Sequence, residues 1–156
     1  MSTFRPTGKS ADRAWPLSSI LLLLFGAGLA LMGLYFIFLR PPLLPEDLRY
    51  MGASLAQLES AAPRLTDWLA QVFRVMGGYV SATGLLTVAV AATSFRSHNR
   101  GAAVAVAAAG LASIGLMMIV NFMINSDFKW LLLGAAILWA CSIVLFWSEG
   151  ARPRDG

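Results

Sequence analysis

Side chains able to bind a ligand stand near the ends of the apolar runs of this chain. They supply a carboxylate, cations, phenols and a carboxamide, which together can donate and accept hydrogen bonds. In an antiparallel helical bundle these positions all reach the same end. We therefore predict one candidate vestibule at that end, formed by Tyr35, Arg40, Arg74, Tyr79, Asn121, Asp127 and Lys129.

Asn121 has the strongest reason to seek a partner, because a carboxamide inside a membrane favours a hydrogen bond to a neighbouring helix. A packing role is the simpler alternative to ligand binding. The segment NSD at 125–127 also has the composition of a turn and helix cap. Arg74 is expected to pair with Asp67, Asp127 or a lipid phosphate. Both interpretations, binding and packing, stay open.

Catalytic constellations are missing from the sequence. A single cysteine, Cys141, excludes disulfides, C-x-x-C redox chemistry and cysteine zinc sites within one chain. The single histidine, His98, lies in the basic segment RSHNR, so haem or a metal between the helices lacks its usual ligands. The centres of the apolar runs hold no ionisable side chain other than that cysteine. We predict no catalytic residue, no cofactor and no metal.

Composition points to a membrane chain. Hydrophobic residues make up 58% of the 156 residues and charged residues 13%, about half the charged fraction of a soluble domain. Four apolar runs approach or exceed the roughly 20 residues that a helix needs to cross the hydrocarbon core. The prediction is an all-α, integral membrane four-helix bundle in which residues 15–148 form a single domain, with spans at 16–39, 75–95, 102–124 and 130–147.

Basic residues are distributed unevenly between the two ends of this bundle. The end with both termini and the 96–100 turn carries seven Lys and Arg against three acids, and the other end five against five. We predict that the chain lies in the cell inner membrane. The positive-inside rule then predicts that both termini face the cytoplasm. The basic tail at 1–14 is predicted to be disordered and suits anionic lipids, not nucleic acid. Residues 149–156 are predicted to form a C-terminal tail.

The outer connection, residues 40–74, is predicted to be ordered. It opens with RPPLLPEDLRYMG, whose prolines stop the first span at Arg40. Ser54 and Gln57 have capping-box spacing for a short amphipathic helix. An apolar stripe at 65–76 then either lies along the interface or runs continuously into the second span. The connection either covers the bundle end as a lid or binds a partner or ligand.

Small residues recur at helix-packing intervals in three spans. Such faces let helices approach closely in lipid, within one chain or between copies. In mid-span, Trp139 is expected either to pack or to face lipid. The three faces are Gly26, Ala30 and Gly33; Gly77, Ser81 and Gly84; and Ala108, Ala112 and Gly115.

Three functions remain after these exclusions. The first is a non-enzymatic structural, accessory or interaction subunit that contacts membrane lipids, another copy or another membrane protein. The second is a transporter or channel for a small neutral or lipid-like solute, with hydroxyls of the second and third spans along its path. The third is an interfacial lipid- or quinone-linked enzyme. In helix number and size alone the chain resembles the DoxX-like group of small bacterial membrane proteins, and this likeness implies no site residue.

Overall fold

The computed structural model describes residues 15–151, and these residues are helical with no β-strand among them. The sequence prediction of an all-α chain with four membrane-length apolar helices is confirmed. The predicted tail at 1–14 and most of that at 149–156 lie outside the described residues. The four long segments are Leu17–Phe38, Leu65–Phe95, Arg100–Met123 and Lys129–Gly150.

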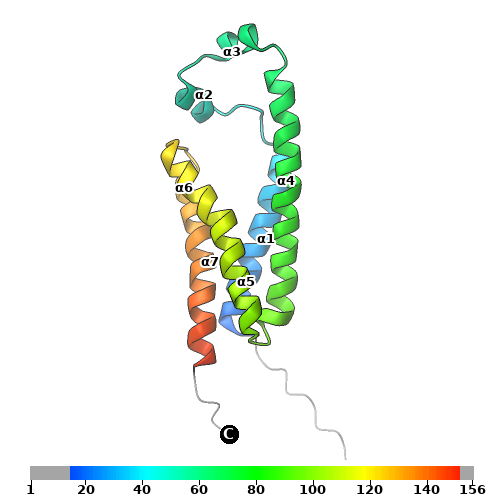
Figure 1. Ribbon diagram of the computed structural model, residues 1–156, viewed down its shortest axis with the longest axis vertical. Helices are drawn as coiled ribbons and strands as arrows, with labels where there is room; N and C mark the ends of the chain where they lie inside the picture. Colours follow the sequence, from blue (N-terminus) through cyan, green and yellow to red (C-terminus); the bar gives the residue numbers. More distant parts are fainter. Residues whose placement is uncertain (1–14, 152–156) are drawn as a thin grey trace, which may run out of the picture.

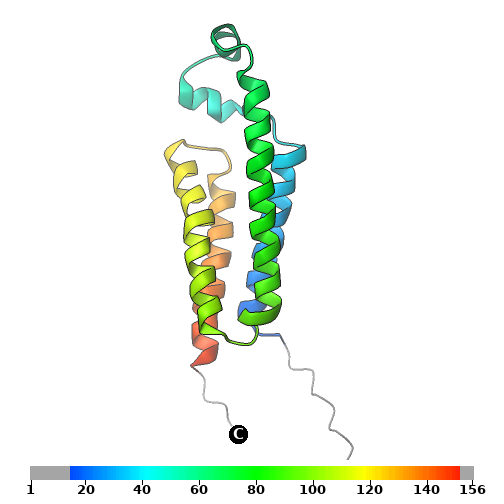
Figure 2. The same ribbon diagram turned by 45° about the vertical axis from the view of Figure 1, so that its right-hand side comes forward.

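The long segments form two antiparallel pairs (Figures 1 and 2). Helices α1 and α4 are one pair, and α5 with α6 packs beside α7 as the other. Helix α1 also packs against α7 and so joins the two pairs. The short helices α2 and α3 stand over the end that we call the outer end. The elements are α1 (Leu17–Phe38), α2 (Pro45–Met51), α3 (Leu55–Ala61), α4 (Leu65–Val90), the π-helical η1 (Ala91–Phe95), α5 (Arg100–Gly110), the π-helical η2 (Leu111–Gly115), α6 (Leu116–Met123) and α7 (Lys129–Gly150).

Helices α1 and α4 meet backbone to backbone along a seam of small residues. A Cβ atom placed on Gly77 would lie 2.6 Å from the carbonyl oxygen of Gly33, and one on Gly84 would lie 2.3 Å from the backbone nitrogen of Ala30. No side chain fits in such a space. Two of the three predicted small-residue faces therefore pack against each other within the chain.

The third predicted face does not pack within this chain, since Ala108 and Ala112 are exposed. Helix α5 instead meets α7 at Gly110, where an added Cβ would lie 2.1 Å from the indole of Trp139. The Trp139 Nε1 also donates a hydrogen bond to the carbonyl oxygen of Val106, at 3.3 Å. The mid-span tryptophan thus fastens α7 to α5.

The inner end, opposite α2 and α3, is closed by aromatic packing and by a charged cap. The rings of Phe95 and Phe146 lie 4.5 Å apart, and Phe95 is fully buried. Glu149 accepts hydrogen bonds from the backbone N–H of Ser18 at 3.2 Å and from its hydroxyl at 2.5 Å. A carboxylate is favourable at the N-terminus of α1. Glu149, which we expected in the tail, belongs to the last turn of α7.

The outer connection contains two short helices, one more than predicted. The predicted one is α3, whose capping box is formed: the Gln57 backbone N–H donates to the Ser54 Oγ at 3.3 Å, and the Ser54 N–H donates to the Gln57 Oε1 at 2.8 Å. The other is α2, which begins at Pro45, ends at Met51 and is followed by Gly52 with φ of 65°. Glycine has no Cβ and adopts that left-handed conformation without steric strain.

Helix α4 settles the alternatives left open for the apolar stripe at 65–76. The stripe is continuous with the second span, so that one helical segment of 31 residues runs from Leu65 to Phe95. At 1.5 Å per residue this segment is about 46 Å long, whereas the 22 residues of α1 give about 33 Å. Helix α4 therefore extends beyond α1 at the outer end and carries α3 away from the bundle (Figure 1).

Candidate functional site

Arg40 is the centre of the polar contacts at the outer end. Its guanidinium carbon lies 3.4 Å from the centre of the Phe73 ring and 5.3 Å from that of Phe36. Its Nη2 lies 3.3 Å from the Asp47 Oδ2, and its Nη1 donates to the Pro41 carbonyl at 2.9 Å. Arg40 thereby joins the end of α1, the outer part of α4 and the first turn of α2.

The Arg40 side chain is buried, with 8% of its surface exposed. Burial lowers the pKa of its guanidinium from the ordinary value, and the Asp47 carboxylate acts in the opposite direction. An arginine keeps its proton in either case. A desolvated cation over an aromatic ring contributes about 2 kcal/mol. The guanidinium is therefore a structural anchor.

Helix α2 also binds the turn between α6 and α7, through two pairs that we call the outer latch. Glu46 is 4% exposed and accepts a hydrogen bond from the Ser126 hydroxyl at 3.1 Å. The Arg49 Nη2 lies 2.9 Å from the Asp127 Oδ1 in an exposed ion pair. The buried pair Glu46–Ser126 contributes more to the stability of the outer latch than the exposed pair Arg49–Asp127, because solvent screens the exposed pair. Together they connect the two helix pairs at the outer end.

Three other predicted site residues bond to nearby groups on their own helix or turn. Such local bonds order few additional groups, so they compete well with longer-range partners. The expected interhelical bond of the carboxamide is therefore not made. The pairs are Asn121 Nδ2 with the Met117 carbonyl oxygen (2.9 Å), Arg74 with the Gln71 side chain (3.2 Å) and Lys129 with the Asn125 side chain.

The two tyrosines complete the predicted set. Tyr35 is half-buried beside Phe36, with ring centres 5.9 Å apart. Tyr79 is 74% exposed and lies on the side of α4 that faces α6. Of the seven predicted residues, Arg40 and Asp127 thus both hold α2, and Tyr79 lines a cavity. Tyr35 lies beside Arg40, whose backbone N–H donates to the Tyr35 carbonyl oxygen at 2.8 Å.

Sequence reasoning did not place Glu46, Asp47 and Ser126 among the seven vestibule residues. A signal for the first two was present, because Pro45 followed by two acids is the pattern of a helix start. Asp47 in fact accepts the backbone N–H of Leu44 at 2.8 Å and so caps α2. No local signal marks Ser126 as the partner of a residue 80 positions earlier.

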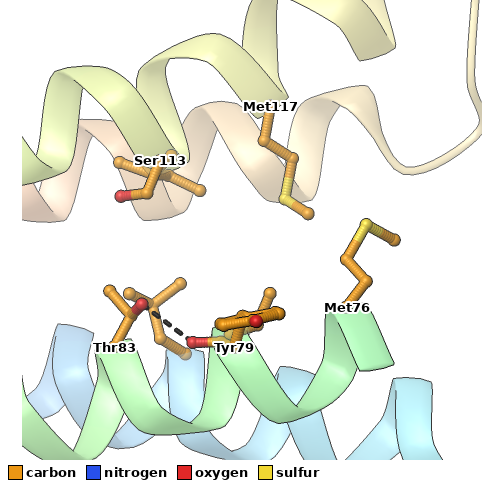
Figure 3. A pocket seen from close by; sticks show the side chains of 8 residues that line it. Met76, Tyr79, Thr83, Ser113 and Met117 are labelled. Atoms are coloured by element: carbon orange, nitrogen blue, oxygen red, sulfur yellow. Dashed lines mark hydrogen bonds between the residues drawn. The ribbon is translucent and has the colours of Figure 1, made fainter. Parts of the chain in front are cut away.

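A lateral groove separates α4 from α5, η2 and α6. It consists of two adjoining cavities of about 230 Å³ and about 360 Å³ that share Leu29, Thr83 and Ser113. Figure 3 shows the first of them, with Met76, Tyr79 and Thr83 of α4 opposite Ser113 and Met117. On α1, Leu29 lines both cavities and Phe25 lines the second.

Three hydroxyl groups that line the lateral groove, those of Thr83, Thr87 and Ser113, are bonded within their own helices. Thr83 and Thr87 each donate to the carbonyl four residues earlier at 2.8 Å, and Ser113 does so at 2.7 Å. The groove walls named for both cavities contain no charged side chain. The lateral groove therefore offers an apolar surface to a ligand.

Among residues 15–151, no group of three or more His, Cys, Asp or Glu side chains could hold a metal ion. Comparison of the chain with protein-family models, with curated proteins and with solved structures gives no match. The likeness to the DoxX-like group in helix number and size thus transfers no residue and no activity. Function must be inferred from the outer latch, the outer connection and the lateral groove.

Proposed function

We propose that this chain is a four-span protein of the cell inner membrane, with both termini in the cytoplasm, that acts as a non-enzymatic interaction subunit. The outer connection, residues 40–74, is the part that would dock on another membrane protein. Four helices of membrane length support the membrane location. The excess of basic residues at the inner end supports the orientation.

The observation that carries this proposal is that the outer connection has no core of its own. Helix α3 contains no buried residue. Large apolar side chains along α2, α3 and the outer part of α4 are exposed, and exposed apolar patches mark interaction surfaces. They are Tyr50, Met51, Leu55, Trp68 and Val72.

The height of these residues favours a protein partner over the lipid chains. The Phe73 ring lies beside Phe36 near the end of α1, with ring centres 6.2 Å apart. Trp68 lies five residues further along α4, and Leu65 eight, which is about 8 Å and about 12 Å beyond that level. The headgroup layer is only about 5 to 8 Å thick on each side. Their apolar surface therefore stands at or beyond the headgroups.

The charge of the outer connection agrees with this. Residues 40–74 hold four arginines and four acids. Such a neutral segment has no net attraction to an anionic bilayer surface. A partner protein with a complementary apolar patch is a better match.

Photo-crosslinking in cells tests the proposal. A photoreactive amino acid replaces Tyr50 or Trp68, and Ser97 in the inner turn as the control position. We expect both outer positions to give the same discrete protein adduct, identified by mass spectrometry, and Ser97 not to give it. Adducts with lipid only at both outer positions, or the same proteins from all three positions, would contradict the docking role.

The alternative, a transporter or channel, draws its support from the lateral groove. Of the hydroxyls expected on its path, Thr83, Thr87 and Ser113 do line the groove. Ser81 instead donates to the carbonyl oxygen of Ala30 in the α1 seam, at 3.3 Å. Because Thr83, Thr87 and Ser113 donate their hydroxyls within their own helices, the interaction subunit remains the better-supported function.

A further inference from the structure

We propose that α2 is a strap that holds the outer part of α6 near α4, and that opening of the outer latch lets α6 swing away from α4. Such a movement widens the lateral groove at its outer end. The inference goes beyond the proposed function, because it needs neither a docked partner nor a ligand in the groove.

Helix α2 contacts both helix pairs within a few residues. On one side, Asp47 pairs with Arg40 at the end of α1. On the other side, the outer latch joins Glu46 and Arg49 to the turn that follows α6. Figures 1 and 2 show α2 over the outer end of the molecule. The strap therefore runs from the first helix pair to the end of α6.

The outer parts of α4 and α6 face each other across a cavity. Helix α4 is held on α1 by the glycine seam, and close packing between the two helix pairs involves α1 with α7 and η1 with α5. In the outer cavity, Met76 of α4 lies opposite Met117 of α6 (Figure 3). The distance between α4 and α6 at this end therefore depends on what α2 connects.

The span that contains α6 has a bending point. The π-helical η2, Leu111–Gly115, interrupts the α-helical hydrogen bonds between α5 and α6, and helices bend at such segments. On the inner side of η2, Gly110 fixes α5 against Trp139. On the outer side, α6 contains no buried residue. A bend at η2 therefore moves α6 and leaves the anchored part of the span in place.

Helix α2 can detach without opening an apolar core. Glu46 is its one buried residue, and the contacts that hold α2 are polar side-chain pairs. Water replaces such partners when they separate, so each pair adds little net stability. Gly52 after α2 allows the direction of the chain to change. Segments with few buried apolar contacts open well before the whole protein unfolds.

Distances between spin labels test this inference in the full chain, reconstituted in lipid nanodiscs. Nitroxides are attached to Val75→Cys in α4 and Met123→Cys in α6, which are exposed positions, in a variant that also carries Cys141→Ala. A second pair, Thr93→Cys and Val104→Cys, reports on the inner end. Pulsed electron spin resonance gives the distance distribution of each pair.

The outer latch is opened by Glu46→Ala combined with Arg49→Ala. The matched control is Glu59→Ala combined with Arg64→Ala, which removes the same two residue types from α3 and from the residue before α4. Both variants therefore lose one acid and one arginine from the same connection.

A bend of about 20° at η2 moves Met123, about 12 Å further along the helix, by roughly 4 Å. We expect the latch variant to gain a population with an outer distance longer by about that amount, about tenfold larger than in the parent protein. The inner distance, and both distances in the control variant, should stay as in the parent protein.

An unchanged outer distance in the latch variant overturns the strap, as does an equal change in the control variant or at the inner pair. Should the latch variant fail to fold, Ser126→Ala combined with Asp127→Ala opens the same latch from the other side and should give the same longer distance. Failure of the docking role would show in the crosslinking experiment and would leave these distances unaffected.

Discussion

The two sides of α4 contain similar residues, but one side packs closely against a neighbouring helix and the other side does not. Toward α1, Gly77, Ser81 and Gly84 are in backbone contact with the neighbouring helix. Toward α5 and α6, Thr83 and Thr87 border a groove. Small or hydroxyl side chains on one helix therefore do not decide whether a face closes. The facing helix must present its own small residues in register, which α1 does with Gly26 and Gly33.

The α1 seam should be the most sensitive part of the molecule to a single methyl group. Gly77→Ala places a Cβ 2.6 Å from the Gly33 carbonyl, so we expect a loss of about 2 to 3 kcal/mol in the free energy of unfolding. Gly78→Ala is the matched control, since no atom lies within 4 Å of its added Cβ. Unfolding in mixed detergent micelles measures both. Equal stability of the two variants would mean that the seam is not closed.

Arg40 should come second, because it joins α1, α4 and α2 at the open end. Arg40→Ala removes the ring stacking and the contact with Asp47, for an expected local loss of about 2 kcal/mol. Hydrogen exchange of the backbone amides in residues 45–75 should accelerate, while exchange near Phe95 stays slow. Arg40→Lys keeps the charge but not the planar stack and should fall between. Unchanged exchange at 45–75 in both variants would remove Arg40 from this role.

The two pairs of the outer latch should differ in the same assay. Ser126→Ala leaves the buried Glu46 without its hydroxyl donor, for an expected cost of about 1 kcal/mol. Arg49→Ala breaks an exposed pair and should cost below about 0.5 kcal/mol, less still in high salt. A larger effect of Arg49→Ala would show that the latch depends on the exposed pair.

The groove side of α4 should tolerate added volume. We expect Thr87→Leu to change the free energy of unfolding by less than about 0.5 kcal/mol, because the cavity has room for the larger side chain. The same detergent unfolding assay measures it beside Gly77→Ala. A loss as large as that of Gly77→Ala would mean that the groove is closed in solution.

The long helices could be predicted because length and hydropathy alone define an apolar segment that can cross a membrane. The α1 seam could be predicted in part, since glycine spacing shows that a face is small. Glycine spacing does not show which face of which other helix this small face packs against. Ala108 and Ala112 have the same spacing but stay exposed, and Gly110, which we did not single out, receives Trp139. Which small residue of α5 is buried depends on where the fold places α7.

The polar residues show the same limit. Asn121 was expected to reach another helix but bonds to its own, where the Met117 carbonyl is one turn away. The burial of Arg40 depends on Phe73, which α4 brings close only because that helix extends past the span. Helix α2 was accessible to sequence reasoning through Pro45 and the acids after it, whereas Ser126 was not. Local signals define caps, and long-range partners require the fold.

The most direct test of the account is the sidedness of two single cysteines in a variant whose Cys141 is replaced by alanine. Ser60→Cys lies in α3 and Ser97→Cys in the turn after η1, and both positions are exposed. We expect a membrane-impermeant maleimide to label Ser60→Cys in intact cells, and Ser97→Cys only after the membranes are opened. Labelling of both from the same side would contradict a chain that crosses the bilayer between them, and labelling of Ser97→Cys alone would contradict its orientation.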